Sequence, residues 1–200
     1  MRISNRKSSP KVIGGKVQKK NNHSLTGDYY IVQQRMPLID RQRPGKGFRH
    51  LLKQKDIEEF IGILPDWNEL SLGLNAIVLA PGEWTTFGYH VPGVVHICAW
   101  DADLWTELSK KGYEQEREIL ERLGVPCEET EDGVLCKFTE ETARGHQLLA
   151  TLLHELGHHH DRMTTKSKVR TARGESYAEA YAKAYSERIW NQYQEVFGVF

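Results

Sequence analysis

Cysteine is scarce in this sequence, with three residues in 200: Cys98, Cys127 and Cys136. A small, odd number excludes the dense disulfide framework of small secreted proteins. Cys127 and Cys136 flank an expected turn at Asp132-Gly133, so they can face each other across a hairpin and form a disulfide. A zinc site built on them would need further ligands that the neighbouring sequence lacks. We expect three reduced thiols that pack as small apolar side chains.

Long apolar runs are also missing. No stretch approaches the roughly 20 apolar residues needed to cross a bilayer, and residues 1 to 22 lack the apolar segment of a secretory signal. We therefore expect a soluble, cytoplasmic protein without a membrane partner.

Acidic residues are absent from residues 1 to 27. Residues 1 to 55 hold 14 Lys/Arg and two acids, whereas residues 56 to 200 hold 13 Lys/Arg and 25 acids, so a net charge of zero hides a basic end and an acidic body. The composition predicts a disordered basic arm over residues 1 to 27 and one domain over residues 28 to 200. Such an arm can bind nucleic acid or another acidic partner, fold back onto the body, or remain a solvated tail.

Apolar spacing and turn residues predict mainly strands first and helices last. Strands are expected at 29–32, 72–79, 85–90 and 94–100, with a small hairpin at 127–138. Helices are expected at 56–64, at 101–123, from Thr139 or Thr142 to about His160, and, after a polar linker at 162–173, from Gly174 through Tyr193. This order favours the α+β class.

The strongest chemical signal is the sequence His-Glu-Leu-Gly-His at residues 154 to 158. On a helix, His154 and His158 lie on one face, where two imidazoles can bind one Zn²⁺ at roughly 2.0–2.1 Å. Glu155 lies near the open side of such an ion. It can take a proton from a zinc-activated water and return it to a leaving group. Gly157 indicates that another segment packs closely against this helix.

A catalytic zinc usually has three protein ligands and one open position. The third is expected from the last helix, where Glu175 and Glu179 are four residues apart and face one direction. Either carboxylate can bind the ion. The other can accept a hydrogen bond from the free ring nitrogen of a ligand histidine.

These two segments carry a family resemblance. The run His154 to Asp161, followed at residues 175 to 181 by Glu-Ser-Tyr-Ala-Glu-Ala-Tyr, resembles the gluzincin metallopeptidases. It is similar in pattern to the catalytic domain of anthrax lethal factor and to small metallopeptidases that cleave phage or stress repressors. The resemblance implies a zincin-like fold, with a small mixed or antiparallel sheet packed on the active-site helix and a carboxy-terminal helix. It also implies Glu175 as the third zinc ligand and Glu179 as a support for a ligand. The tyrosine that precedes the third ligand in the lethal-factor pattern has no counterpart, since position 168 is Lys.

A further group must stabilise the charge that develops on the substrate oxygen. Tyr181 is the first candidate for this role of transition-state stabiliser, beside Tyr177, Tyr185, His90 and His96. The spacing of Tyr181 and Tyr185 also fits core aromatics.

Zincin-like folds pair an extended peptide with an edge strand above the active-site helix. The strand at residues 74 to 79, or the strand at residues 94 to 100, is expected to be that edge. His146 is expected to be a capped or surface histidine. His159 and His160 are expected to support the ligands, mark the helix end or lie on the surface.

The sequence therefore predicts a zinc metallopeptidase with one Zn²⁺ per chain and a protein or peptide substrate. His154, His158 and Glu175 bind the ion, and Glu155 is the general base and acid. One alternative is a zinc amidohydrolase that acts on a non-peptide amide at the same site. Another is a nucleic-acid-associated regulator that uses the basic amino-terminal segment. A third is a structural zinc domain with a fourth ligand from His159 or His160.

Overall fold

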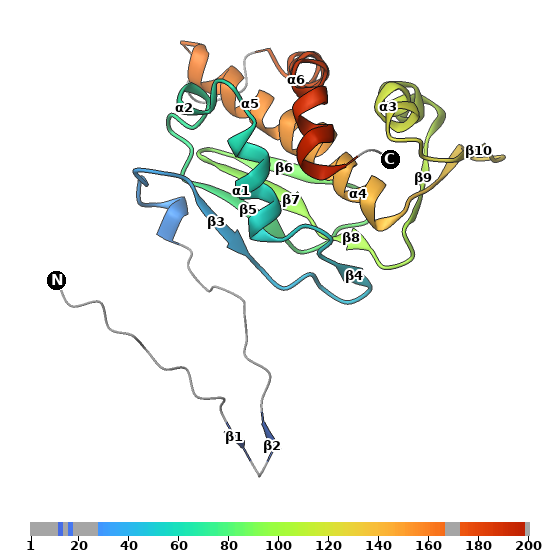
Figure 1. Cartoon of the computed structure of the whole chain (residues 1–200), viewed down its shortest axis with the longest axis horizontal. Helices are drawn as coiled ribbons and strands as arrows, with labels where there is room; N and C mark the ends of the chain where they lie inside the picture. The colour runs from blue at the N-terminus through green and yellow to red at the C-terminus, as the bar shows by residue number, and fades with distance from the viewer. Residues whose placement is uncertain (1–11, 14–15, 18–27, 167–172, 199–200) are drawn as a thin grey trace.

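The computed structural model of the chain describes residues 12–13, 16–17, 28–166 and 173–198 (Figure 1). Within the amino-terminal part, β1 (Val12–Ile13) pairs antiparallel with β2 (Lys16–Val17). The rest of the predicted basic arm, and residues 167–172 of the predicted linker, lie outside the described residues.

A four-stranded mixed sheet lies at the centre of the fold. Its strands in chain order are β3 (Leu38–Arg41), β5 (Ala76–Ala80), β6 (Gly88–Val91) and β7 (Val94–Cys98). The spatial order is β3-β5-β7-β6, with β3, β5 and β7 parallel and β6 antiparallel to β7. The predicted α+β class is confirmed, and so is the turn at Pro92-Gly93, where Val91 pairs with Val94.

The predicted edge strand is wrong. Both candidate segments supply inner strands of the sheet, β5 and β7, and every residue of β5 and β7 is buried. Continuous apolar runs are typical of strands that are covered on both faces. The free edges belong to β3 and to β6, and the residues of β6 are partly or largely exposed.

The predicted strand at residues 29–32 is also wrong. Residues Asp28–Tyr30 form a short 3₁₀ helix, η1, and the chain then turns. Tyr29 is buried and its hydroxyl donates a hydrogen bond of 2.9 Å to Asp40 on β3. The aromatic residues of this segment thus cover the sheet face opposite the main helices instead of pairing with a strand.

Two small sheets flank the central one. Their strands are β4 (Phe48–Arg49) with β8 (Trp100–Asp101), and β9 (Trp105–Leu108), β10 (Cys127–Glu129) and β11 (Val134–Lys137) in the order β10-β11-β9. The predicted hairpin at 127–138 is confirmed, and Cys127 lies opposite Cys136 as free thiols. The helix predicted from residue 101 begins later, as α3 (Lys110–Arg122), because residues 105–108 pair with β11 instead.

The remaining helices are α1 (Gln54–Gly62), α2 (Trp67–Leu70), α4 (Glu140–His146), α5 (Leu153–Thr164) and α6 (Glu175–Phe197). Thr139 caps α4 as predicted, since its side chain accepts a hydrogen bond from the Thr142 N–H. A π-helical segment, η2 (Gln147–Leu152), joins α4 to α5 where one continuous α-helix was expected. Such segments are frequent next to functional sites.

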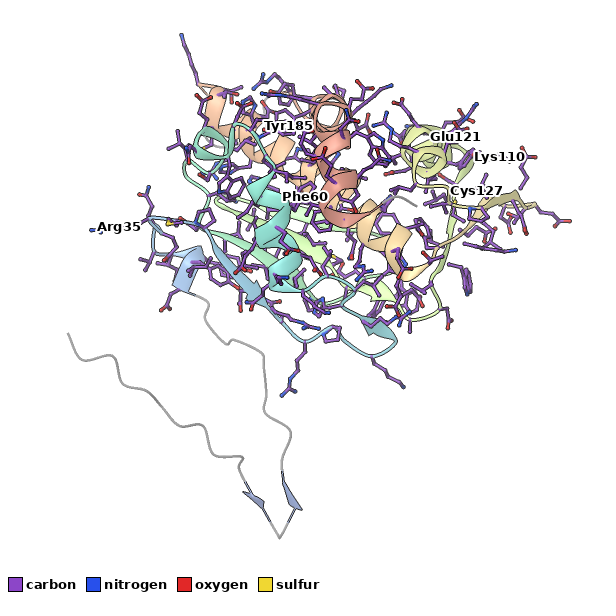
Figure 2. All side chains as sticks on the ribbon, in the orientation of Figure 1. Arg35, Phe60, Lys110, Glu121, Cys127 and Tyr185 are labelled. Carbon is purple, nitrogen blue, oxygen red and sulfur yellow. The ribbon has the colours of Figure 1, made fainter. Side chains whose placement is uncertain are left out.

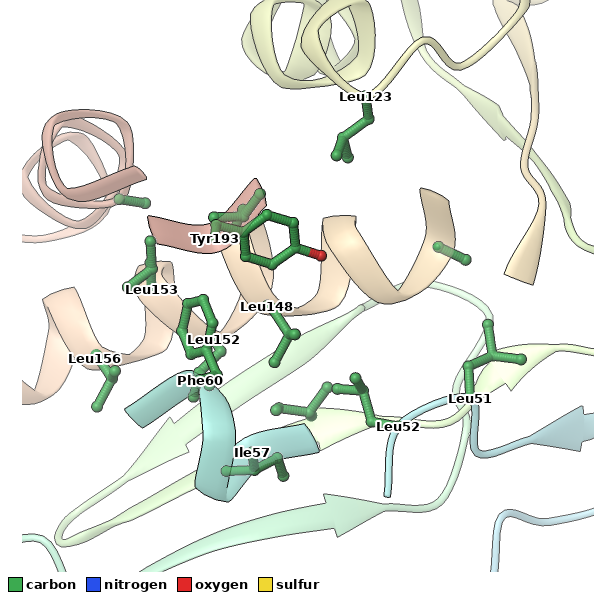
Figure 3. Packing of buried hydrophobic residues seen from close by; sticks show 14 of the residues in the cluster. Leu51, Leu52, Ile57, Phe60, Leu123, Leu148, Leu152, Leu153, Leu156 and Tyr193 are labelled. Atoms are coloured by element: carbon green, nitrogen blue, oxygen red, sulfur yellow. The ribbon is translucent and has the colours of Figure 1, made fainter. Parts of the chain in front are cut away.

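The helical run formed by η2 and α5 is held in the core between the sheet and α6 (Figure 1). On one side, Leu148 and Leu152 face Leu52, Ile57 and Phe60 (Figure 3), and all five are at most 1% exposed. Burial of one such side chain contributes roughly 1.5–3 kcal/mol. This helix is therefore a rigid support for the histidines that it carries.

The outer surface of α3 is charged. Its side chains Lys110 and Glu121 point away from the body of the molecule (Figure 2). Among the described residues, no helix has both the length and the apolar character that crossing a membrane requires.

Candidate metal centre

Helix α5 brings two imidazoles together. The Nε2 atoms of His154 and His158 lie 3.1 Å apart, because residues four apart lie one helical turn from each other. Burial first, and the nearby His158 second, lower the pKa of His154 below its ordinary value. His154 is therefore neutral at pH 7, with a ring-nitrogen lone pair free to bind a metal ion.

Glu175, the first residue of α6, completes the group. Its Oε2 lies 3.2 Å from His154 Nε2 and its Oε1 lies 3.4 Å from His158 Nε2. The three ligand atoms all lie within 4.8 Å of one another. Atoms bound to a tetrahedral zinc ion at 2.0–2.1 Å lie about 3.3 Å apart. The observed spacings therefore fit a divalent ion such as zinc, and two nitrogens with one carboxylate are donors that zinc accepts.

The crossing of α5 and α6 depends on Gly157. A Cβ atom at this position would lie 2.9 Å from Ala178 Cα and 3.2 Å from the Ala178 carbonyl oxygen. The close packing partner predicted from this glycine is therefore the backbone of α6. The close approach of the α6 backbone to Gly157 brings the start of α6 near His154 and His158.

Glu155 lies in the floor of a cleft beside the metal group. The residue is 5% exposed, and its Oε2 atom is buried without a hydrogen-bond partner among the described residues. Burial, with a smaller contribution from Glu175, raises the pKa of Glu155 to about 8. A carboxyl group with a raised pKa is suited to accept and return a proton near neutral pH.

The edge strand β6 lies directly against this floor. A Cβ atom at Gly88 would lie 2.6 Å from Thr151 Cγ2 and 3.2 Å from Glu155 Cγ. Only a glycine lets the strand approach so closely. The sequence analysis missed Gly88, although a glycine inside a predicted strand is a usable signal of close approach.

The cleft has a volume of about 770 Å³. Its walls are β6 and the preceding segment on one side, and α3 with the first half of α6 on the other. His154, Glu155 and His158 lie between them.

Helix α3 contributes a residue that the sequence analysis also missed. Glu116 lines the cleft, and its carboxylate lies 3.1 Å from His146 Nε2. Burial acts to raise the pKa of Glu116, but the contact with His146 outweighs burial, so the pKa lies below its ordinary value. His146 is 2% exposed among aromatic side chains, so its predicted surface position is wrong. A contact across 30 residues leaves no local sequence signal.

Glu179 and Tyr181 lie away from the metal group. Glu179 lines the cleft, and its Oε1 accepts a hydrogen bond of 2.9 Å from Gln115 on α3. The expected hydrogen bond from a ligand histidine to Glu179 is absent from the described residues, where His158 Nδ1 has no partner. Tyr181 packs against His160 and lines a separate cavity of about 290 Å³. The described structure therefore does not bring Tyr181 to the cleft as a transition-state stabiliser.

The other candidates for the transition-state stabiliser lie in different parts of the molecule. His90 on β6 lines the cleft, with its ring centroid 6.5 Å from that of His158 and its Nε2 buried. His96 on β7 lies 2.7 Å from the Tyr30 hydroxyl, on the opposite face of the sheet. Tyr185 lines the smaller cavity with Tyr181. Of these groups, only His90 lines the cleft.

The residues after His158 turn away from the three candidate ligands. His159 Nε2 lies 3.0 Å from the Leu72 carbonyl oxygen, and His160 Nδ1 lies 2.7 Å from the Tyr177 hydroxyl. Within the described part of the chain, the metal group therefore has three protein ligands and an open side toward the cleft. That arrangement is typical of catalytic zinc sites, whereas structural zinc sites are closed by four protein ligands. Comparison of the chain with family models, with curated proteins and with solved structures found no match.

Proposed function

We propose that this protein is a zinc-dependent metallopeptidase with a zincin-like fold, as its motif resemblance implies. The observation that carries the proposal is the convergence of three ligand atoms, from His154, His158 and Glu175, beside the buried carboxyl of Glu155 in an open cleft. A solvated helix face does not require such convergence. Glu175 in particular is 75% exposed yet lies against both histidines.

Each residue then has a defined task. His154, His158 and Glu175 hold the ion and leave one side free. When bound, zinc polarises a carbonyl group and lowers the pKa of water toward about 7. Glu155 accepts a proton from the attacking water and delivers it to the nitrogen of the leaving amine, so the peptide bond breaks and a carboxylate and an amine are formed.

Substrate binding is assigned to β6. Among the described strands, β6 pairs only with β7, so its outer edge offers free N–H and C=O groups beside the metal group. An extended peptide can pair with that edge, which fixes the scissile bond without selecting strongly among side chains. The opposite wall can select by charge. Its acids outnumber its bases, since Glu114, Glu116, Glu118 and Glu179 line it with Arg122 and Lys183. Both bases are paired with Glu118, while Glu114 is paired with Arg117 and Glu116 contacts His146. We therefore expect extended substrates with basic side chains.

The test is a digest of a peptide library containing Lys/Arg-rich and Asp/Glu-rich members by zinc-loaded protein. We expect cleavage that a chelator abolishes and added zinc restores, with basic peptides cleaved faster. Glu155→Gln should retain zinc but lower turnover at least about 100-fold, since loss of a general base removes 10²–10⁴-fold. The matched control is Glu121→Gln on the outer face of α3, which should leave turnover unchanged.

Full turnover in the zinc-loaded Glu155→Gln variant would contradict the assignment of the base. Zinc binding without cleavage of any peptide, together with hydrolysis of a small non-peptide amide, would favour the amidohydrolase instead. Neither result would depend on the charge preference.

A further inference from the structure

Helix α6 begins without a cap of its own. Its N-cap residue, Gly174, has no side chain to accept a hydrogen bond from the first turn, and its φ of +71° is a left-handed conformation. The next residue is Glu175, the proposed third ligand. Because no side chain of the N-cap residue fixes this helix end, its position depends on contacts made by the residues around it.

Asp161 on α5 holds the two residues that lead into the helix, Arg173 and the N-cap residue Gly174. One carboxylate oxygen accepts hydrogen bonds from the backbone N–H groups of Arg173 (2.9 Å) and Gly174 (3.2 Å). The other accepts one of 2.8 Å from Arg173 Nε. Asp161 is 0% exposed, so its carboxylate depends on partners inside the protein.

A second tie joins the same two helix ends. The Tyr177 hydroxyl, in the first turn of α6, lies 2.7 Å from Nδ1 of His160 on α5. The guanidinium of Arg173 lies over the Tyr177 ring, 3.7 Å from its centroid. Gly174 and Tyr177 lie on either side of Glu175 in the sequence, and both are hydrogen-bonded to the end of α5.

Glu175 itself has few other supports. Its side chain is 75% exposed, and its contacts among the described residues are those with His154 and His158. A mobile carboxylate would lose conformational freedom on binding the ion, whereas one placed in advance by its backbone loses less. His158 and Asp161 are three residues apart on α5, so one helix end carries both a ligand and the anchor of the next ligand.

We propose that Asp161 is a positioning residue for zinc, which fixes the start of α6 so that Glu175 meets the ion bound by His154 and His158. The inference rests on the proposed zinc site. It assigns no contact with substrate or metal to Asp161. It explains why the fully buried carboxylate of Asp161 is present although Asp161 takes no part in the proposed reaction.

The test is a double-mutant cycle on zinc affinity, measured by competition with a chelator. Asp161→Asn should weaken zinc binding roughly 10–100-fold, which is typical for loss of a residue that orients a ligand. In a Glu175→Ala background, the same change should weaken binding less than about twofold, because the residue being positioned is gone. An equal loss in both backgrounds, or no loss in either, would overturn the proposal.

Two further variants keep the test informative. Asp56→Asn is the matched control, since Asp56 accepts a backbone N–H at the start of α1, far from the cleft, and it should leave zinc affinity unchanged. If Asp161→Asn does not fold, Arg173→Met removes one of the three donors and should lower zinc affinity by a smaller factor, again only when Glu175 is present. Hydrogen exchange of the metal-free protein should show faster exchange of the Tyr177 and Ala178 amides in Asp161→Asn and not in Asp56→Asn.

Failure of this inference is separate from failure of the proposed function. Zinc binding that depends on Asp161 through Glu175, without peptide cleavage, would sustain the positioning role and reject the peptidase. Peptide cleavage together with a zinc affinity that does not depend on Asp161 would support the peptidase and reject the positioning role. Absence of zinc binding by the wild-type chain would reject both.

Discussion

The proposed zinc ligands come from two helices that are held in different ways. His154 and His158 lie on α5, whose leucines are buried against the sheet and α1 and whose other side packs on α6. Glu175 lies at the very start of α6 and is 75% exposed. Two ligands are thus fixed by apolar packing, and the third by polar contacts at a helix end.

This difference shows how one site can combine rigidity with access. The buried helix would give a bound ion a fixed pair of nitrogens at a constant separation. The exposed helix start leaves the opposite side open to the cleft, which a catalytic site requires. Apolar packing cannot hold an exposed carboxylate, so a buried acceptor, Asp161, holds the backbone in front of it.

Removal of a ligand from each helix gives the largest expected effect. His158→Ala removes a nitrogen that packing has already fixed, so zinc affinity should fall by more than the roughly 10–100-fold typical of losing an outer partner. Glu175→Ala should weaken binding less, by about that factor, because water can reach the vacated position. Isothermal calorimetry of both variants, with the zinc content of each, would measure the difference. Equal losses would mean that both helices place their ligands equally well.

The three candidate ligands were predictable from the sequence, His154 and His158 by their spacing and Glu175 by the family resemblance, whereas the contacts that place α6 and the order of the sheet were not. The spacing of His154 and His158 is set by one helical turn. The start of the preceding helix, α4, is marked in the sequence by its N-cap residue, Thr139. The order of the sheet depends on pairings between distant segments, so β6 was not recognised as the edge. Asp161 and Arg173 are separated by a linker that the sequence shows only to be polar, so their contact had no local signal.

A buried histidine of the central sheet and the anchor of α6 should also respond differently to acid. Burial lowers the pKa of His96 on β7 from 6.5 to about 4, so the unfolded chain binds this proton more tightly than the folded one. The free energy of unfolding should therefore be unaffected by His96 above pH 6.5 and fall as the pH drops toward 4, by up to about 3 kcal/mol. Asp161 behaves oppositely. Hydrogen bonds from Arg173 and Gly174 outweigh burial and hold its pKa below 3.8, so its contribution persists until the pH falls below that value.

Urea unfolding of the metal-free protein between pH 3 and 7 would separate these contributions. His96→Gln should flatten the profile between pH 4 and 6.5 by up to about one proton, or ~1.4 kcal/mol per pH unit. An unchanged slope in this variant would assign the acid sensitivity to the other buried histidines. His90 and His159 are two such groups, since the pKa of each is also lowered, mainly by burial.

The smallest expected effect lies where the two helices touch. Gly157→Ala adds a Cβ atom 2.9 Å from the Ala178 backbone, and backbone cannot move aside as a side chain can. Overpacking of this kind costs roughly 1–3 kcal/mol, which exceeds the ~1 kcal/mol that alanine gains in a helix. The matched control is Gly62→Ala at the end of α1, where nothing lies within 4 Å of the added atom, and it should be neutral or stabilising. If Gly157→Ala lowers stability but leaves zinc affinity intact, the anchor at Asp161 alone is enough to place Glu175. If stability and zinc affinity fall together, the position of Glu175 depends on the close packing of α5 against α6 as well as on the hydrogen bonds of Asp161.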